Sequence, residues 1–174
     1  FMKKIKVIVY FSIISTIFSQ KVLIPMDQTQ TDHIKAYGIA FWSLENNQEV
    51  DWLLNYRGGS FLLLNNKQLQ NECIIRGVSY HIINSIQVNE IYQIIEENNM
   101  EIVLLEKSPK IAVYSPPDKQ PWDDAVTLAL TYAEIPYDVI FDEEILLGEL
   151  INYDWLHLHH EDFTGQYGKF YKNY

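Results

Sequence analysis

From residue 110 onward the sequence alternates short apolar segments with amphipathic ones, and this alternation restricts the fold more than any other feature. The spacing predicts strands over 110–115, 137–141 and 154–159, joined by helices over about 122–134 and 143–152. Strands that are joined through helices run parallel, because the helix returns the chain to the starting edge of the sheet. The sequence therefore predicts an α/β fold with a parallel sheet in this part of the chain.

The last predicted strand runs into a cluster of ionisable side chains. Its alternation places Trp155, His157 and His159 on one face of the strand. The cluster itself lies at or beyond the carboxyl end of the strand, the edge where open parallel sheets bind ligands, and it comprises His159, His160, Glu161 and Asp162. Imidazole and carboxylate groups gathered at such an edge are candidate catalytic residues.

A structural role and a metal site are the alternatives for this region. Helices cover both faces of a parallel sheet, so we expect His157 to contact protein rather than water, and a core histidine bonded to backbone satisfies the pattern. Glu161 and Asp162 then form a solvated loop. In the metal hypothesis His157 and His159 are two ligands on one strand face, and Glu161 or Asp162 completes the set.

The loop at 115–121, with the sequence SPPDKQP, separates the strand at 110–115 from its helix and contains no glycine. Phosphate-binding loops need glycines so that backbone amides can approach the phosphate, so this loop is unlike that of a nucleotide site. We therefore expect no organic cofactor. A divalent metal is the one cofactor still considered, because histidines are common metal ligands. Asp118 and Lys119 are candidate binding residues, because the loop leaves the same sheet edge as His159.

The first half of the chain predicts a smaller α/β region. Its predicted strands cover 21–26, 49–56, 61–64, 78–83 and 101–105, and its predicted helices cover 32–45, 67–76 and 88–97. The pair Gly58 and Gly59 between two apolar runs predicts a β-hairpin. Alternatively, Arg57 and the glycine amides form an anion-binding loop, with Asp27 as a further candidate binding residue.

A short spacer divides the two regions. Lys107, Ser108 and Pro109 are too few to form a parallel crossover, so the chain turns back or enters another unit there. We expect an amino-terminal region over 21–107 and a second domain over 108–174. Cys73 is the single cysteine, which excludes an internal disulfide, and its place on a helix one turn after Leu69 predicts packing rather than catalysis.

The first twenty residues are typical of a secretory signal peptide. Three lysines precede the apolar run 7–18, and Ser19 and Gln20 follow it as the expected cleavage region. A retained membrane anchor is the alternative, although the run is short for a bilayer. The prediction is an exported protein of the periplasm or cell envelope that meets the membrane only during export.

The charge balance limits the partners. The chain has 23 acidic residues against 13 basic ones, three of which lie in the signal segment, and this balance repels phosphate backbones. We therefore expect no nucleic acid partner and consider a small-molecule or glycan ligand instead. Because Phe1 precedes Met2 and the sequence stops at Tyr174, soon after the ionisable cluster, we also expect a truncated carboxyl-terminal part.

Several stretches of the sequence resemble a family of exported bacterial proteins that is commonly labelled asparagine synthetase B. They are KIAVYSPPDKQPWDDAVTLALTYAEIPYDVIFDEE at 110–144, YDWLHLHHEDFTGQYGKF at 153–170, VLIPMDQTQTDHIKAYGIAFW at 22–42 and VDWLLNYRGGSFLL at 50–63. The resemblance implies a fold similar to class I glutamine amidotransferases, with a flavodoxin-like parallel sheet preceded by a smaller α/β region that contains a hairpin.

The catalytic motifs of these enzymes do not occur in the 174 residues. There is neither a Ser-Gly-Gly-x-Asp-Ser loop for ATP nor a Gly-x-Cys-x-Gly elbow for a thiol nucleophile, and in an amidotransferase fold that elbow would follow Tyr174. Three functions stay open: an exported amidotransferase-like protein acting on amide or glycan-type molecules, a non-catalytic binding module of the cell envelope, and a metal-dependent hydrolase using His157 and His159.

Overall fold

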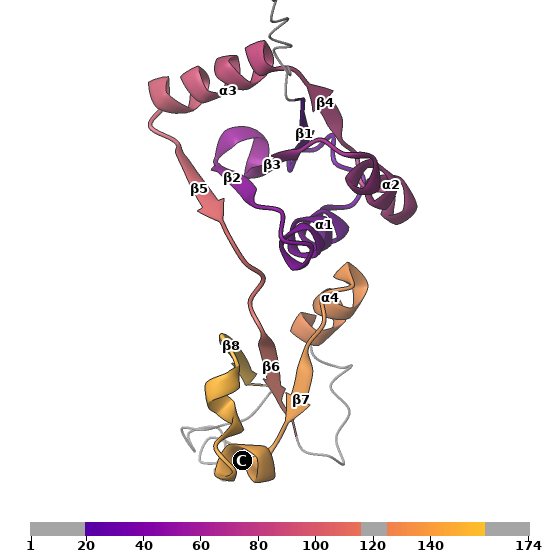
Figure 1. Cartoon of the computed structure of the whole chain (residues 1–174), viewed down its shortest axis with the longest axis vertical. Coiled ribbons are helices and arrows are strands. Elements are labelled where there is room, and N and C mark those ends of the chain that lie inside the picture. The colour runs from indigo at the N-terminus through magenta and orange to yellow at the C-terminus, as the bar shows by residue number, and fades with distance from the viewer. Residues whose placement is uncertain (1–19, 116–124, 159–174) are drawn as a thin grey trace, which may run out of the picture.

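A computed structural model describes residues 20–115 and 125–158, which form two sheets with helices packed on them (Figure 1). The amino-terminal unit, residues 20–105, consists of β1 (Lys21–Ile24), α1 (His33–Glu45), β2 (Val50–Leu54), the 3₁₀ turn η1 (Tyr56–Gly58), β3 (Ser60–Leu64), α2 (Lys67–Arg76), β4 (His81–Ile83), α3 (Ser85–Glu97) and β5 (Glu101–Leu105). The carboxyl-terminal unit, the described residues from 111 to 158, consists of β6 (Ile111–Tyr114), α4 (Ala125–Ala133), β7 (Asp138–Ile140), α5 (Asp142–Leu146), the 3₁₀ turn η3 (Glu149–Asn152) and β8 (Trp155–Leu158).

The helices of the amino-terminal unit begin after residues that can cap a helix, although α3 begins at Ser85, three residues before the start predicted for it. The Asp32 carboxylate accepts a hydrogen bond from the Lys35 N–H at 2.9 Å and caps α1. Asn66 and Asn84 cap α2 and α3 in the same way. Gly77 adopts the left-handed conformation, with φ 72°, and ends α2.

The first sheet is antiparallel, with the strand order β4-β1-β3-β2-β5. The predicted hairpin is confirmed, because β2 and β3 pair antiparallel with Leu53 opposite Ser60. The strand predicted over 49–56 is shorter than expected. Asn55 and Arg57 both have positive φ, which breaks the extended conformation and turns the chain through η1 instead.

Helices cover both faces of this antiparallel sheet. Val22 and Ile24 of β1 point to the face covered by α1 and α2, whereas Leu23 points to the face covered by α3. The central strand β3 is buried from Ser60 to Leu63, which explains its unbroken apolar sequence. Cys73 lies on the buried face of α2 and packs in the core, as the sequence predicts.

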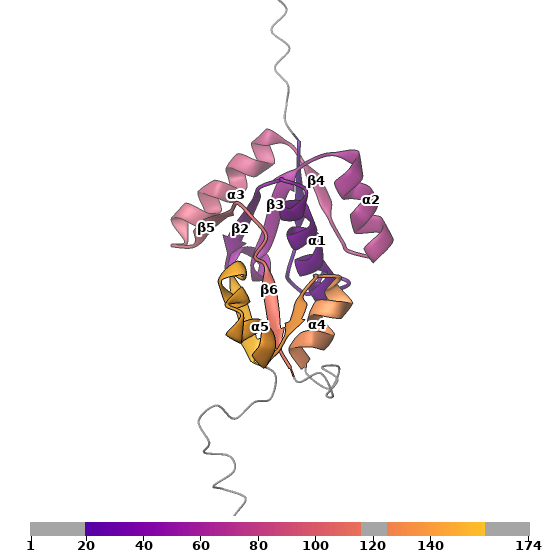
Figure 2. The ribbon, with the colours of Figure 1, turned by 60° about the horizontal axis from the view of Figure 1, so that its bottom comes forward.

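The second sheet is parallel, as predicted, with the order β7-β6-β8. In the described residues, β6 is the central strand and is buried from Ile111 to Val113. Figure 2 shows α4 to one side of β6 and α5 to the other. The prediction of one helix over 143–152 is wrong, because Gly148 adopts φ 83° and divides the segment into α5 and η3.

The chain passes from one sheet to the other across residues 106–110. The strand before this segment, β5, is the edge strand of the antiparallel sheet, and the strand after it, β6, lies at the centre of the parallel sheet. A change of unit is one of the two outcomes that the short Lys107-Ser108-Pro109 spacer allowed.

The two units also meet through α1 and α4. A Cβ atom on Gly38 of α1 would lie 2.0 Å from the Ala133 carbonyl oxygen of α4, so the helices approach as closely as a glycine permits. Glu134, which follows α4, forms ion pairs with Lys35 at 3.1 Å and with Arg76 at 3.3 Å. A third apolar cluster, formed by Phe41, Ile111 and Leu130, joins α1 to the parallel sheet.

The predicted signal segment, residues 1–19, lies outside the described residues. Within 20–115 and 125–158, the helices are all too short or too polar to cross a membrane.

Candidate functional site at the carboxyl edge of the parallel sheet

The candidate site begins with Ser115, the residue that follows the central strand β6. Its N–H donates to the Ile140 carbonyl of β7 at 3.0 Å, which holds it at the carboxyl edge of the sheet. Only 1% of Ser115 is exposed, yet its Oγ has no hydrogen-bond partner among the described residues. A buried hydroxyl without a partner costs about 1–3 kcal/mol, so this group is unusual in a folded chain.

The residue before Ser115 is a tyrosine that is bonded to an aspartate. The Tyr114 hydroxyl donates to the Asp142 carboxylate at 2.6 Å, which connects the end of β6 to the start of α5. The Tyr114 ring also lies against Phe141, with 5.1 Å between the ring centroids. The end of β6 therefore carries a buried hydroxyl beside a phenol that is bonded to a carboxylate, and groups of these kinds can form hydrogen bonds with polar molecules.

The strand that leads to the predicted ionisable cluster ends at this same edge. In the register of the parallel sheet Leu158 of β8 pairs with Tyr114, so both strands end at one level. The candidate catalytic residues that follow Leu158 lie outside the described residues, and they are His159, His160, Glu161 and Asp162. The candidate binding residues Asp118 and Lys119 also lie outside them.

His157 is half-buried on β8, opposite Val113 in the register of the sheet. Its ring lies beside that of Trp155, with 6.5 Å between the centroids. No group of three or more histidine, cysteine or acidic side chains in 20–115 and 125–158 is arranged to hold a metal ion. The metal site built on His157 and His159 stays a prediction, because His159 is not among the residues described.

The structure brings together two candidate binding residues of the amino-terminal unit, Asp27 and Arg57. The Arg57 Nε donates to the Asp27 carboxylate at 2.6 Å, and Thr29 donates to the same carboxylate through its N–H and its hydroxyl. The hydrogen bond from Arg57 is the main reason why the pKa of Asp27 lies well below its usual range. Their mutual contact ties the hairpin turn to the end of β1.

Arg57 also lines a pocket of about 440 Å³ between β4 and α3. Three further polar residues of the lining are His81, Gln87 and Glu90. If Arg57 binds an anion, as the alternative interpretation has it, the ligand would lie in this pocket, close to His81 and Glu90. The sequence alone does not show that these two residues lie near Arg57. The guanidinium is already engaged by Asp27 and Thr29, so an anion would have to compete with these internal partners.

The thiol of Cys73, the single cysteine of the sequence, contributes neither to the carboxyl-edge site nor to the Arg57 pocket. Cys73 is fully buried, and burial raises the pKa of its thiol to about 12. A thiolate is the nucleophilic form of cysteine, and this environment suppresses it at neutral pH.

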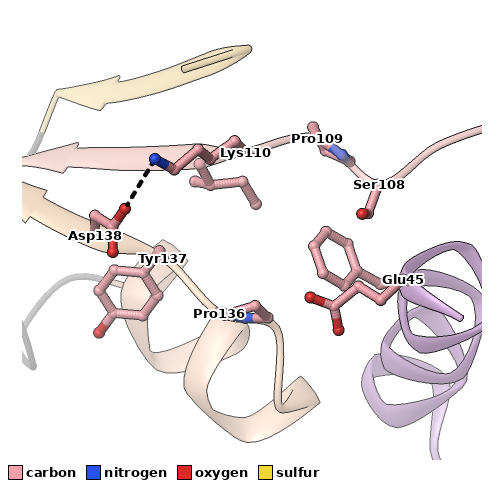
Figure 3. A pocket seen from close by; sticks show the side chains of 9 residues that line it. Glu45, Ser108, Pro109, Lys110, Pro136, Tyr137 and Asp138 are labelled. Atoms are coloured by element: carbon pink, nitrogen blue, oxygen red, sulfur yellow. Dashed lines mark ion pairs between the residues drawn. The ribbon is translucent and has the colours of Figure 1, made fainter. Parts of the chain in front are cut away.

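A second pocket, which sequence reasoning missed, lies where the two units meet and has both apolar and polar residues in its lining (Figure 3). Its lining includes Glu45 from α1, Ser108 and Lys110 from the connecting segment, and Asp138 from β7. These residues are far apart in the sequence. The Lys107-Ser108-Pro109 spacer was the one feature of the sequence that indicated a junction between two units here.

Comparison of the chain with protein-family models, with curated proteins and with solved structures found no match.

Proposed function

We propose that this is an exported, class I glutamine amidotransferase-like protein that binds a small polar molecule of amide or glycan type at the carboxyl edge of β6 and β8. The observation that carries the proposal is the Ser115 hydroxyl, which is buried at that edge without a hydrogen-bond partner among the described residues. A bound amide or sugar hydroxyl would supply the missing partner.

The strand order supports this location. The first strand of the parallel sheet, β6, lies between the second, β7, and the third, β8, so the connections leave β6 on two sides. Open parallel sheets bind ligands outside the carboxyl ends of the strands at such a reversal, and flavodoxin-like sheets begin with this order. The order is therefore also the main support for the flavodoxin-like fold.

The described residues bear on ligand binding and not on an amidotransferase nucleophile. That chemistry needs an activated thiol. Cys73 does not provide one, because it is buried in the other unit with a raised pKa, and in an amidotransferase fold the nucleophile would follow Tyr174. The candidate acids and bases are His159, His160, Glu161 and Asp162, which follow β8 in the sequence. In this proposal they line the ligand site, and the described edge supplies the hydrogen bonds that orient the ligand.

Replacement of Ser115 by alanine tests the proposal. We expect the free Ser115→Ala protein to be as stable as wild type or more stable, because the substitution removes an unsatisfied buried hydroxyl. We expect binding of the amide or glycan to weaken by about 2- to 10-fold, the value of one neutral hydrogen bond. Glutamine, asparagine and N-acetylglucosamine are suitable probes, titrated by calorimetry and by the shift in melting temperature.

Ser43→Ala is the matched control. Ser43 is equally buried, but its hydroxyl donates to the Ile39 carbonyl within α1 at 2.9 Å. This variant should lose a little stability and keep the wild-type affinity. The proposal is wrong if none of the probes binds, or if Ser115→Ala destabilises the free protein and leaves binding unchanged.

A further inference from the structure

The pocket between the two units lies at the opposite edge of the parallel sheet, before β6 and β7 begin, and is separate from the proposed ligand site. Its volume is about 280 Å³. Phe41 and Ile111, both buried, form part of its lining, together with Pro109 and Pro136 (Figure 3). A concave site with an apolar lining and a few polar groups, placed where two units meet, is the usual setting for a small ligand.

The side of the pocket formed by α1 is negatively charged. Glu45 is the last residue of this 13-residue helix and is exposed, and no partner for its carboxylate exists among the described residues. The carbonyl groups at a helix carboxyl end add partial negative charge, and the last turn of α1 contains no basic residue to offset it. In Figure 3 the Glu45 carboxylate and the Ser108 hydroxyl lie on the same side of the pocket, away from Lys110 and Asp138.

The opposite side of the pocket is close to neutral. Lys110 Nζ lies 3.8 Å from an Asp138 carboxylate oxygen and 4.6 Å from the centre of the Tyr153 ring. The Tyr153 hydroxyl donates to the same carboxylate at 3.1 Å. The positive charge of Lys110 and the negative charge of Asp138 cancel, so the negative charge of Glu45 is uncompensated. The pocket as a whole therefore favours a cation.

We propose that this junction pocket binds a small organic ammonium ion. Its ammonium group lies between the Glu45 carboxylate and the Ser108 hydroxyl, and its short aliphatic body packs on Phe41 and the two prolines. The volume suits an amine of a few carbon atoms. The formal net charge of −10 on the whole chain raises the local concentration of such cations.

The test is a calorimetric titration of the purified chain with n-butylammonium at about 0.15 M ionic strength, where the attraction between distant charges is screened. We expect saturable binding with a dissociation constant on the order of 1 mM, a modest value for so small a ligand. Butyrate, which has the same aliphatic body and the opposite charge, should not bind. Absence of saturable butylammonium binding, or equal binding of butyrate, would overturn the proposal.

Two charge-neutralising variants locate the site. Glu45→Gln keeps the size of an exposed side chain, so it should fold normally and weaken butylammonium binding at least about fivefold. Glu106→Gln removes an equally exposed acid from the connecting segment without altering the pocket lining, and should leave the affinity unchanged. Equal weakening by both variants would show attraction to an acidic surface rather than a pocket, and would refute the assignment. Ser115→Ala should not affect this binding, which separates the junction pocket from the carboxyl-edge site.

Discussion

At the scale of single residues, the absence of a side chain at Gly38 determines how closely two helices approach. Glycine within a helix normally costs about 1 kcal/mol relative to alanine. Here it lets α1 approach the end of α4 so closely that a Cβ atom would lie 2.0 Å from the Ala133 carbonyl oxygen. That oxygen belongs to the backbone, so it cannot rotate away as a side chain would.

We therefore predict that Gly38→Ala destabilises the protein by about 1–3 kcal/mol, the range for overpacked sites, despite the better helix propensity of alanine. Gly38→Ser should cost at least as much. Urea denaturation followed by circular dichroism measures the change in the free energy of unfolding. An increase in stability for Gly38→Ala would mean that α1 and α4 are not in this close contact.

At the scale of elements, the ion pair of Arg57 and Asp27 holds an irregular turn in place. Arg57 has φ 47° and ψ 46°, a left-handed conformation that non-glycine residues seldom adopt. Its neighbour Gly58 leaves no room for a side chain, because a Cβ atom there would lie 2.3 Å from the Met26 carbonyl oxygen. The contact with Asp27 therefore stabilises a turn whose backbone is not favourable by itself.

The stability that Asp27 contributes should depend on pH. Because its pKa in the folded protein is lowered from the ordinary 3.8, the contribution is present above about pH 4 and is lost as the pH falls further. We predict that Asp27→Asn is less stable than wild type at pH 7, and that the difference shrinks steadily below pH 4. Urea titrations at pH 7, 5, 3 and 2 measure it.

Glu49→Gln, which changes an exposed acid in the loop between α1 and β2, is the control for this pH series. It should stay close to wild type at every pH. A stability difference for Asp27→Asn that is the same at pH 2 and pH 7 would show that the carboxylate charge does not support the turn.

The local elements were the most predictable part of the protein. Capping residues such as Asp32, the glycine that ends α2 and the period of apolar residues act through neighbours in the sequence. The helices α1 and α2 follow these signals closely, whereas α3 starts three residues before its predicted beginning. The break at Gly148 carried the same kind of local signal and was missed. The end of β2 at Leu54 was missed as well: Asn55 is a residue that tolerates the left-handed conformation, but the left-handed Arg57 after it carries no such signal.

At the scale of the whole molecule, the contact between α1, α2 and α4 makes the two units one structure. Arg76 of α2 is nearly buried. Its guanidinium nitrogens lie 3.2 Å from a Glu72 carboxylate oxygen and 3.3 Å from a Glu134 carboxylate oxygen. The guanidinium also donates a hydrogen bond to the Ala133 carbonyl. Its loss would leave this carbonyl and two carboxylates with fewer partners, although both carboxylates are partly exposed.

We predict that Arg76→Met, which keeps the aliphatic stem, lowers stability by about 1–3 kcal/mol and loosens the parallel sheet first. Native-state hydrogen exchange measures this directly. The Val113 amide of β6 should exchange faster in the variant, whereas the Leu63 amide of β3 should change little. Arg76→Lys keeps the positive charge but lacks the planar guanidinium. Its stability and its exchange rate at Val113 should lie between those of wild type and Arg76→Met. Equal acceleration at both amides would show that the two sheets unfold only together.

The candidate site was predictable only in its location. The strand period and the helical crossovers pointed to the carboxyl edge of a parallel sheet, and the order β7-β6-β8 agrees with a site there. Ser115 was not recognised, since a serine after a strand carries no signal of burial. Its importance depends on how the sheet and its neighbours exclude water from the hydroxyl.

Short-range interactions therefore account for what could be inferred from the residues alone: where the helices start and stop, which segments are strands, and that the second sheet is parallel. The strand order β4-β1-β3-β2-β5, the pairing of Arg57 with Asp27 and the pocket that joins Glu45 to Asp138 came only from the folded chain. These features bring together residues that are distant in the sequence. They depend on packing and loop closure across the whole molecule, and no local pattern of residues encodes them.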